Sequence, residues 1–126
     1  MKIIEVIESA DTLYPNSYST AEKIKWCDEL GAMLKEEYAK SYSDGKQESY
    51  TPISDISADE TVIPAPYNLM YIDFILAKCC YYQRDYDAYN QHITAFNSRL
   101  DDYARWFIER NIPVRESKNR VNNWWQ

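Results

Sequence analysis

Hydrophobic and polar residues alternate along the chain with the three- and four-residue spacing of α-helices. The first such stretch covers residues 2–14, where acidic residues separate the apolar positions, and it ends at Pro15. The second begins at residues 19–22, whose sequence Ser-Thr-Ala-Glu matches a capping box, and it continues to about residue 41. Gly31 lies inside this second helix, where it indicates a close helix crossing.

Two further helices are predicted, separated by a short turn at Arg84-Asp85. Residues 67–83 carry only two charges, so we expect this helix to be surrounded on most sides. Residues 86–110 carry the longest regular apolar stripe, whose tyrosines we interpret as core residues. Its members are Tyr86, Tyr89, Ile93, Phe96, Leu100, Tyr103 and Phe107. A turn this short makes the two helices an antiparallel hairpin.

Periodicity is missing from residues 42–65 and from residues 112–126. The first of these segments is too long for an ordinary connector, and its apolar residues can anchor it on the bundle or on a partner. The pattern as a whole predicts an all-α fold. We expect a small bundle of about four helices in residues 1–111, with a long antiparallel helical hairpin, and an extended C-terminal arm in residues 112–126.

Composition and charge narrow the functional classes. The 126 residues include only two glycines but twelve tyrosines, which favours helices over strands joined by tight turns. The net charge of −6 is uneven: residues 112–126 carry +2, so residues 1–111 carry −8. An acidic body disfavours direct, sequence-specific nucleic-acid binding. The sequence has no run of apolar residues long enough for a membrane span, and three cysteines indicate a reducing, intracellular environment.

The residues that could carry chemistry form no recognisable catalytic or metal-binding pattern. His92 is the only histidine, and we interpret it as a packed or boundary residue. Cys79 and Cys80 are adjacent on a helix and point apart, so we interpret them as core thiols rather than metal ligands. Acidic pairs such as Asp28-Glu29 are expected to be solvated. We therefore expect no enzymatic activity, no cofactor and no metal.

The segment 112–126 combines positive charge with two adjacent tryptophans. Its tryptophans either fold back onto the bundle, insert into a neighbouring subunit, or belong to a disordered tail. Aromatic and arginine side chains dominate binding hot spots, so the second reading makes the segment an arm that joins subunits head to tail. The residues predicted to form protein interfaces are Tyr50, Ile53, Ile56, Arg115, Lys118, Arg120, Trp124 and Trp125.

About residues 10–110 resemble small proteins encoded in the morphogenesis clusters of tailed phages and prophages of Firmicutes. The resemblance is carried by a P-N-x-Y-S segment before a helix, a P-x-P-Y helix start, a Y-D-x-Y-N segment in a hairpin and a closing aromatic run. The matching residues here are Pro15, Asn16, Tyr18 and Ser19, then Pro64, Pro66 and Tyr67, then Tyr86, Asp87, Tyr89 and Asn90, then Tyr103, Trp106 and Phe107.

This resemblance implies a head–tail connector, also called a neck adaptor. Such a protein would form a homo-oligomeric ring beneath the portal protein and join it to a tail or stopper protein. It would be found in the host cytoplasm during assembly and then in the virion neck. The alternative is a soluble helical interaction or regulatory module of prophage or bacterial origin, without catalytic activity, which the composition permits equally.

Overall fold

The expectation of an all-α bundle is confirmed. The structure, a computed structural model, describes residues 1–39 and 50–111. Its elements, in chain order, are α1 (Ile3–Leu13), α2 (Thr20–Leu34), a π-helical turn η1 (Lys35–Ala39), a 3₁₀ turn η2 (Tyr67–Leu69), α4 (Met70–Tyr82) and α5 (Tyr86–Asn111). The expected helices agree with these bounds to within a residue or two, except that the second ends as a π-helical turn and the third begins as a 3₁₀ turn.

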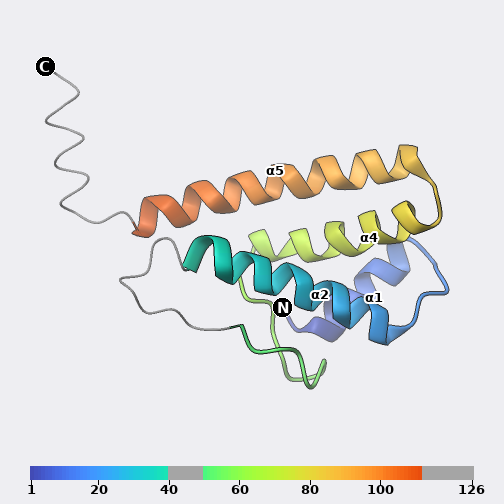
Figure 1. The fold of residues 1–126 in the computed structure, drawn as a ribbon, viewed down its shortest axis with the longest axis horizontal. Helices are drawn as coiled ribbons and strands as arrows, with labels where there is room; N and C mark the ends of the chain where they lie inside the picture. Colours follow the sequence, from blue (N-terminus) through green and yellow to red (C-terminus); the bar gives the residue numbers. More distant parts are fainter. Residues whose placement is uncertain (40–49, 112–126) are drawn as a thin grey trace, which may run out of the picture.

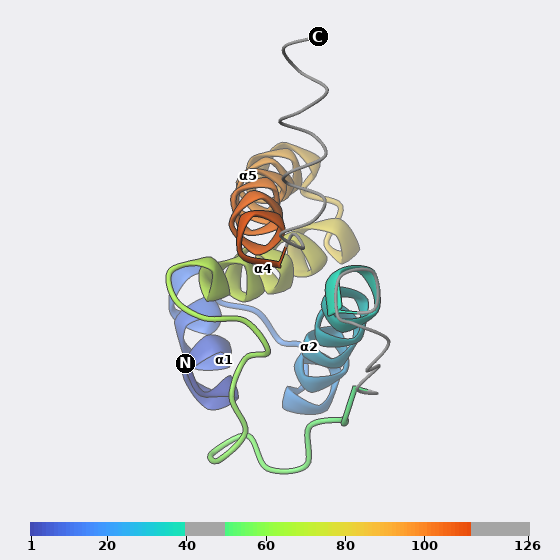
Figure 2. The same cartoon turned by 90° about the vertical axis from the view of Figure 1, so that its left-hand side faces the viewer.

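Helix α4 forms the centre of the bundle, as its low charge content predicted. Figure 2 shows α5 on one side of α4 and both α1 and α2 on the other. Nine of the 13 residues of α4 are buried: Met70, Tyr71, Ile72, Asp73, Ile75, Leu76, Ala77, Cys79 and Cys80. The core therefore surrounds this helix, and α1 and α2 each contribute one apolar face to it.

The hairpin between α4 and α5 closes through a three-residue turn, Gln83 to Asp85. Arg84 adopts a left-handed backbone conformation with φ of 61°, which is uncommon for a residue other than glycine. The backbone N–H of Asp85 donates to the carbonyl of Cys80 at 2.9 Å, and the N–H of Tyr89 donates to the carbonyl of Asp85 at 2.9 Å. These bonds join the end of one helix directly to the start of the next, so the predicted antiparallel hairpin is confirmed (Figure 1).

The connection between α1 and α2 is ordered by side-chain hydrogen bonds. Asn16 accepts the backbone N–H of Tyr18 at 3.1 Å, which forms an Asx turn. Ser19 then caps α2 by accepting the N–H of Glu22 at 3.2 Å, which is the first of the two bonds that a capping box predicts.

The irregular segment 50–66 crosses beneath α1 and α2 and caps the first turn of α1 (Figure 2). The N–H groups of Ile3 and Ile4 donate to the carbonyls of Asp59 and Ile56, each at 3.0 Å. A helix leaves its first N–H groups without partners, so this segment supplies acceptors that α1 itself lacks. No helix within the described ranges is both long enough and apolar enough to cross a membrane.

Candidate protein interface

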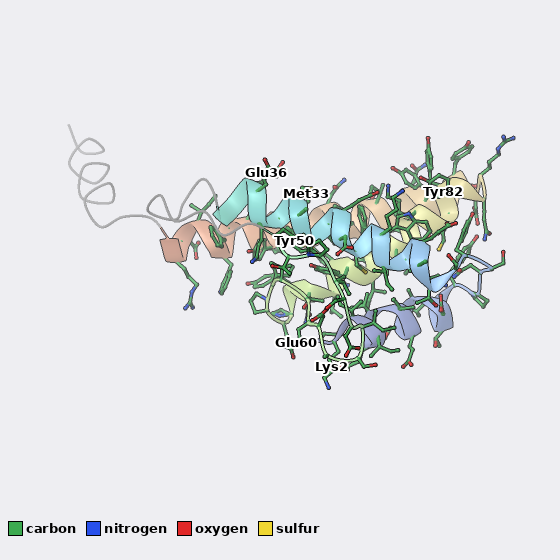
Figure 3. All side chains as sticks on the ribbon, turned by 60° about the horizontal axis from the view of Figure 1, so that its bottom comes forward. Lys2, Met33, Glu36, Tyr50, Glu60 and Tyr82 are labelled. Carbon is green, nitrogen blue, oxygen red and sulfur yellow. The ribbon has the colours of Figure 1, made fainter. Side chains whose placement is uncertain are left out.

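The end of the bundle at the α4–α5 turn exposes large aromatic side chains. Tyr81, Tyr82 and Tyr86 are 53%, 54% and 56% exposed, and we call the two at the end of α4, Tyr81 and Tyr82, the hairpin surface. Tyr81 and Tyr82 occupy the last turn of α4, and Tyr82 is labelled at that end of the molecule in Figure 3. Such a concentration of exposed tyrosine on a small protein is typical of an interaction surface.

Neighbouring rings hold the hairpin surface in place. The ring of Tyr82 stacks on that of buried Trp26 with centroids 6.0 Å apart and an interplanar angle of 14°. Tyr18 meets the same indole edge-on at 5.6 Å. Tyr81 contacts Tyr82 at 5.5 Å and Tyr89 at 5.6 Å. Rings in mutual contact lose little side-chain entropy when a partner binds, so the surface is preorganised.

A groove of about 440 Å³ runs beside these tyrosines between α4 and α5. It is lined by Phe74, Ala77, Lys78, Tyr81, Tyr82, Tyr89 and Ile93. Its single cation is the ammonium group of Lys78, which lies 5.3 Å from the centre of the Phe74 ring and 3.4 Å from a carboxylate oxygen of Glu29. The groove is therefore mainly aromatic and apolar, and its volume is in the range of pockets that accept small ligands or large side chains.

The tyrosines of the fourth predicted helix divide between core and surface. Tyr103 is buried at 6% exposure, as expected for a member of its apolar stripe. The interpretation of Tyr86 as a core residue was wrong, because α5 starts where the other helices no longer cover it. The periodicity identified the correct face of α5 but not how far the neighbouring helices extend along it.

Three of the residues predicted to form interfaces pack within the chain. The hydroxyl of Tyr50 donates to Asp28 Oδ1 at 2.6 Å, and the backbone N–H of Ile53 donates to the same oxygen at 2.9 Å. Ile53 and Ile56 are partly buried against the core. Two roles were considered for the apolar residues of this segment: anchoring it on the bundle or on a partner. The contacts that the structure shows are with the bundle.

Two expectations about α2 are corrected at this point. Asp28 is not a solvated carboxylate, because it is partly buried and accepts two hydrogen bonds from the irregular segment. Gly31 does not mark a helix crossing: a Cβ at this position would lie 2.5 Å from Cε1 of Tyr50, so the glycine accommodates a side chain of the irregular segment. Burial and the hydrogen bond to Asp28 both raise the pKa of Tyr50. Figure 3 shows Tyr50 against α2.

The other five predicted interface residues, Arg115, Lys118, Arg120, Trp124 and Trp125, lie outside the described residues. The same holds for the predicted arm as a whole and for residues 42–49 of the long loop.

Cys27, Cys79 and Cys80 are all buried, which agrees with the interpretation of Cys79 and Cys80 as core thiols. Burial raises the pKa of Cys27 to about 12 and that of Cys79 to about 11, and it also raises the pKa of Cys80. The nearby ammonium of Lys23 opposes this effect at Cys79 but does not cancel it. A thiol that stays protonated at neutral pH is a poor nucleophile and a poor metal ligand.

His92 is partly exposed on α5, which agrees with its interpretation as a boundary residue. It belongs to a charged group between α4 and α5, in which Nε of Arg99 lies 2.7 Å from Oδ2 of buried Asp73. Oδ2 of Asp73 thus contacts Arg99 as an ion pair, but the geometry does not meet the criteria of a hydrogen bond. Burial raises the pKa of Asp73, while the charges of Arg99 and His92 act in the opposite direction. The group connects two helices and contains no nucleophile.

A second hollow, of about 300 Å³, lies between the irregular segment and the helices. Asp59 lines this hollow, and its carboxylate accepts hydrogen bonds from the backbone N–H groups of Ser54 and Asp55 at 2.8 and 3.0 Å. These bonds lower the pKa of Asp59. This carboxylate is therefore occupied in shaping the segment. Within residues 1–39 and 50–111, His, Cys, Asp and Glu form no cluster that could hold a metal ion.

The hairpin surface thus combines exposed aromatic side chains with an adjacent groove, and the sequence analysis did not identify it. Tyr81 and Tyr82 form part of a Cys-Cys-Tyr-Tyr run at the end of a predicted core helix. The adjacent Cys79 and Cys80 are both buried, so the sequence of this run did not distinguish the two exposed tyrosines from core residues. Comparisons with protein-family models, with curated proteins and with solved structures give no match for this chain.

Proposed function

We propose that the chain is a structural adaptor that acts through protein–protein contacts, specifically a head–tail connector of a tailed phage or prophage. In this role it forms a ring on the portal protein and links it to a tail or stopper protein. The observation that carries the proposal is the exposed, preorganised hairpin surface beside the aromatic groove. The identity of the partners comes from the resemblance of residues 10–110 to connector proteins.

The architecture is suited to contact between proteins. Helix α5 has 26 residues, so it is about 39 Å long, and it packs chiefly on α4. Helix α4 is only 13 residues long, so part of α5 extends past its end (Figure 1). A long helix with one main neighbour offers its remaining flanks to other subunits.

The chemistry of the described residues also favours binding over catalysis. The thiols are kept protonated by burial, and the one histidine lies beside an ion pair rather than beside a nucleophile. Catalytic groups need a reacting partner within hydrogen-bond reach. Two other groups with shifted pKa values join two elements: Asp73 pairs with Arg99 of α5, and Tyr50 donates to Asp28 of α2.

Electron microscopy of the full chain mixed with a portal protein from the same phage or prophage genome tests the proposal. Ring-shaped density that caps the portal is expected. The measurement needs the mixture, because ring closure can require the portal as a template, so a monomer in isolation is compatible with the proposal. Absence of any association at micromolar concentrations of both proteins would refute it and would favour a regulatory or interaction module in the cytoplasm.

A further inference from the structure

The groove beside the hairpin surface has the chemistry of a receptor for aromatic and cationic side chains. Its lining contains three tyrosine rings, one phenylalanine ring, the apolar side chains of Ala77 and Ile93, and Lys78. Aromatic faces attract both other rings and the cations of arginine and lysine. The same molecule shows this preference twice, with Lys78 above Phe74 at 5.3 Å and Arg110 above Trp106 at 5.0 Å.

The turn beside the groove is fixed before any partner binds. The hydroxyl of Tyr14 donates to Oε1 of Gln83 at 2.8 Å, which ties the turn to the end of α1. The N–H of Gln83 donates to the carbonyl of Cys79 at 3.1 Å, and that of Arg84 donates to Tyr81 at 3.1 Å. A receptor whose rings and backbone are already ordered loses little entropy on binding.

A segment of matching chemistry exists in the chain itself. Residues 112–126 contain Arg115, Lys118 and Arg120 together with Trp124 and Trp125, and their net charge is +2. Residues 1–111 as a whole carry −8, and Lys78, the one charged residue in the groove lining, is paired with Glu29. Tryptophan, tyrosine and arginine are the residues most enriched in binding hot spots. The segment is thus complementary to the groove in side-chain type and to residues 1–111 as a whole in charge.

Geometry favours the segment of a second copy over that of the same chain. Residues 112–126 follow Asn111, whereas the groove lies at the start of α5. The distance along the helix from Tyr89 to Asn111 is about 33 Å. To reach its own groove, a chain would have to reverse direction and run extended over this distance. A second copy placed end to end brings its Asn111 beside the groove directly, with the repeating contact that closes into a ring.

We infer that the groove between α4 and α5 at the hairpin surface binds the aromatic, basic segment 112–126 of a second copy of this chain. The inference deepens the proposed function. It rests on that function in one respect, namely that several copies of the chain assemble with one another. It assigns the head-to-tail contact to Tyr81, Tyr82 and Tyr89 on one subunit and to Trp124 and Trp125 on the next.

Photocrosslinking in the full chain tests the inference. A benzophenone amino acid replaces Trp125, and equal amounts of ¹⁴N- and ¹⁵N-labelled protein are mixed, refolded together, irradiated both with and without the portal protein, and analysed by mass spectrometry. Mixed-isotope crosslinks to peptides that contain residues 74–93 are expected. The same probe at Asn97, on the exposed face of α5, is the control for random contact and should give at least tenfold less of this product.

Two tyrosine variants make the test specific. Tyr81→Ser removes a wall of the groove and should lower the yield of mixed-isotope product about tenfold. Tyr86→Ser removes an equally exposed tyrosine that does not line the groove, and it should leave the yield within twofold. Circular dichroism of both variants should match that of the parent protein.

The possible outcomes separate this inference from the proposed function. Crosslinks within one isotope only, crosslinks to other surfaces, no crosslinks, or equal yields from the two tyrosine variants would each overturn it. If the portal binds while these crosslinks are missing, the inference fails and the proposed function stands. If the crosslinks form and the portal does not bind, the connector function fails and the contact between copies stands.

Discussion

At the scale of single residues, the contact between Gly31 and Tyr50 attaches the irregular segment to α2. A Cβ on residue 31 would lie 2.5 Å from Cε1 and 2.9 Å from Cζ of the tyrosine ring. The ring is held by the hydrogen bond from its hydroxyl to Asp28, at 2.6 Å. Adding a methyl group at residue 31 therefore has two opposing effects on stability. Alanine is a better helix former than glycine, but its Cβ displaces the Tyr50 ring.

Gly31→Ala should destabilise the protein by about 1 kcal/mol. Alanine gains about 1 kcal/mol over glycine inside a helix, but losing a hydrogen bond to a charged acceptor costs about 1.5–3 kcal/mol. Urea denaturation checks the value. In a Tyr50→Ala background the obstruction is gone, so the same substitution should stabilise by up to about 1 kcal/mol. The same sign in both backgrounds would contradict this account.

Asp73 gives a second prediction, in the pH dependence of stability. Burial raises its pKa above 3.8, because the ion pair with Arg99 and the charge of His92 do not fully offset the loss of solvent. The folded protein therefore holds this proton more tightly than the unfolded chain. The contribution of Asp73 to stability must decrease as the pH rises from below 3.8 through the raised pKa.

Asp73→Asn should accordingly be more stable than the parent protein at pH 7. This advantage should shrink as the pH falls through the raised pKa of Asp73 and disappear below 3.8, where the side chain is protonated in both the folded and the unfolded protein. Guanidinium denaturation at several pH values measures the difference between the two proteins, which removes the effect of carboxylates they share. Asp101→Asn, on the exposed face of α5, is the matched control and should change stability by less than about 0.5 kcal/mol. Lower stability of Asp73→Asn at pH 7 would show that the ion pair outweighs burial.

At the scale of elements, the helices and the hairpin could be predicted from the sequence. Apolar residues spaced three and four apart lie on one face of an α-helix, and a long run of them predicts a helix with that face buried. The stripe of α5 correctly placed Phe96 and Tyr103 in the core. The attachment of residues 50–66 could not be predicted in the same way. It depends on single contacts with α1 and α2, such as that of Tyr50 with Asp28, and these leave no periodic signal.

The packing of α1 on α2 includes a buried charge that the stripes did not reveal. Lys23 is only 3% exposed, and its ammonium lies 2.7 Å from Oδ1 of Asp11, whose side chain is 42% exposed. Asn16 donates to the same carboxylate oxygen at 3.1 Å. The carboxylate thus neutralises a cation that α2 places against the core.

Removing the two partners of this pair should have unequal effects. Asp11→Ala leaves a buried ammonium without a counter-charge and should destabilise by about 3 kcal/mol or more. Lys23→Met keeps the length of the side chain without its charge and should change stability by less than about 1 kcal/mol in either direction. Thermal unfolding of both variants measures the asymmetry, with Glu8→Ala on the exposed face of α1 as control. Equal losses would mean that the pair itself, rather than the buried cation, determines stability.

At the scale of the whole molecule, the site was less predictable than the fold. Periodicity shows which face of a helix is apolar, but exposure depends on how far the neighbouring helices reach. The hairpin surface exists because α4 and α5 meet where α1 and α2 give incomplete cover, and this is a property of relative lengths and positions (Figures 1 and 2). The predicted interface residues Tyr50, Ile53 and Ile56 are partly buried and make contacts within the chain, while their role in an interface stays a prediction.

The same layering predicts how stability is distributed. Helix α4 contacts α1, α2 and α5, and nine of its residues are buried, whereas α5 packs chiefly on α4. Backbone hydrogen bonds covered on several sides open only in global unfolding, while those covered on one side open locally at a lower free energy. We therefore expect amide exchange to be slowest in α4, intermediate in α1 and α2, and fastest among the helices in the last turns of α5.

Hydrogen–deuterium exchange followed by mass spectrometry measures this order. Opening of residues 104–111 should require at least about 2 kcal/mol less than opening of α4, which corresponds to roughly thirtyfold faster exchange. The start of α5 provides an internal control, because the bonds of the turn tie it to α4, so its amides should exchange more slowly than those at the other end. Uniform protection along α5 would contradict the layered account, since that helix would then open only together with α4.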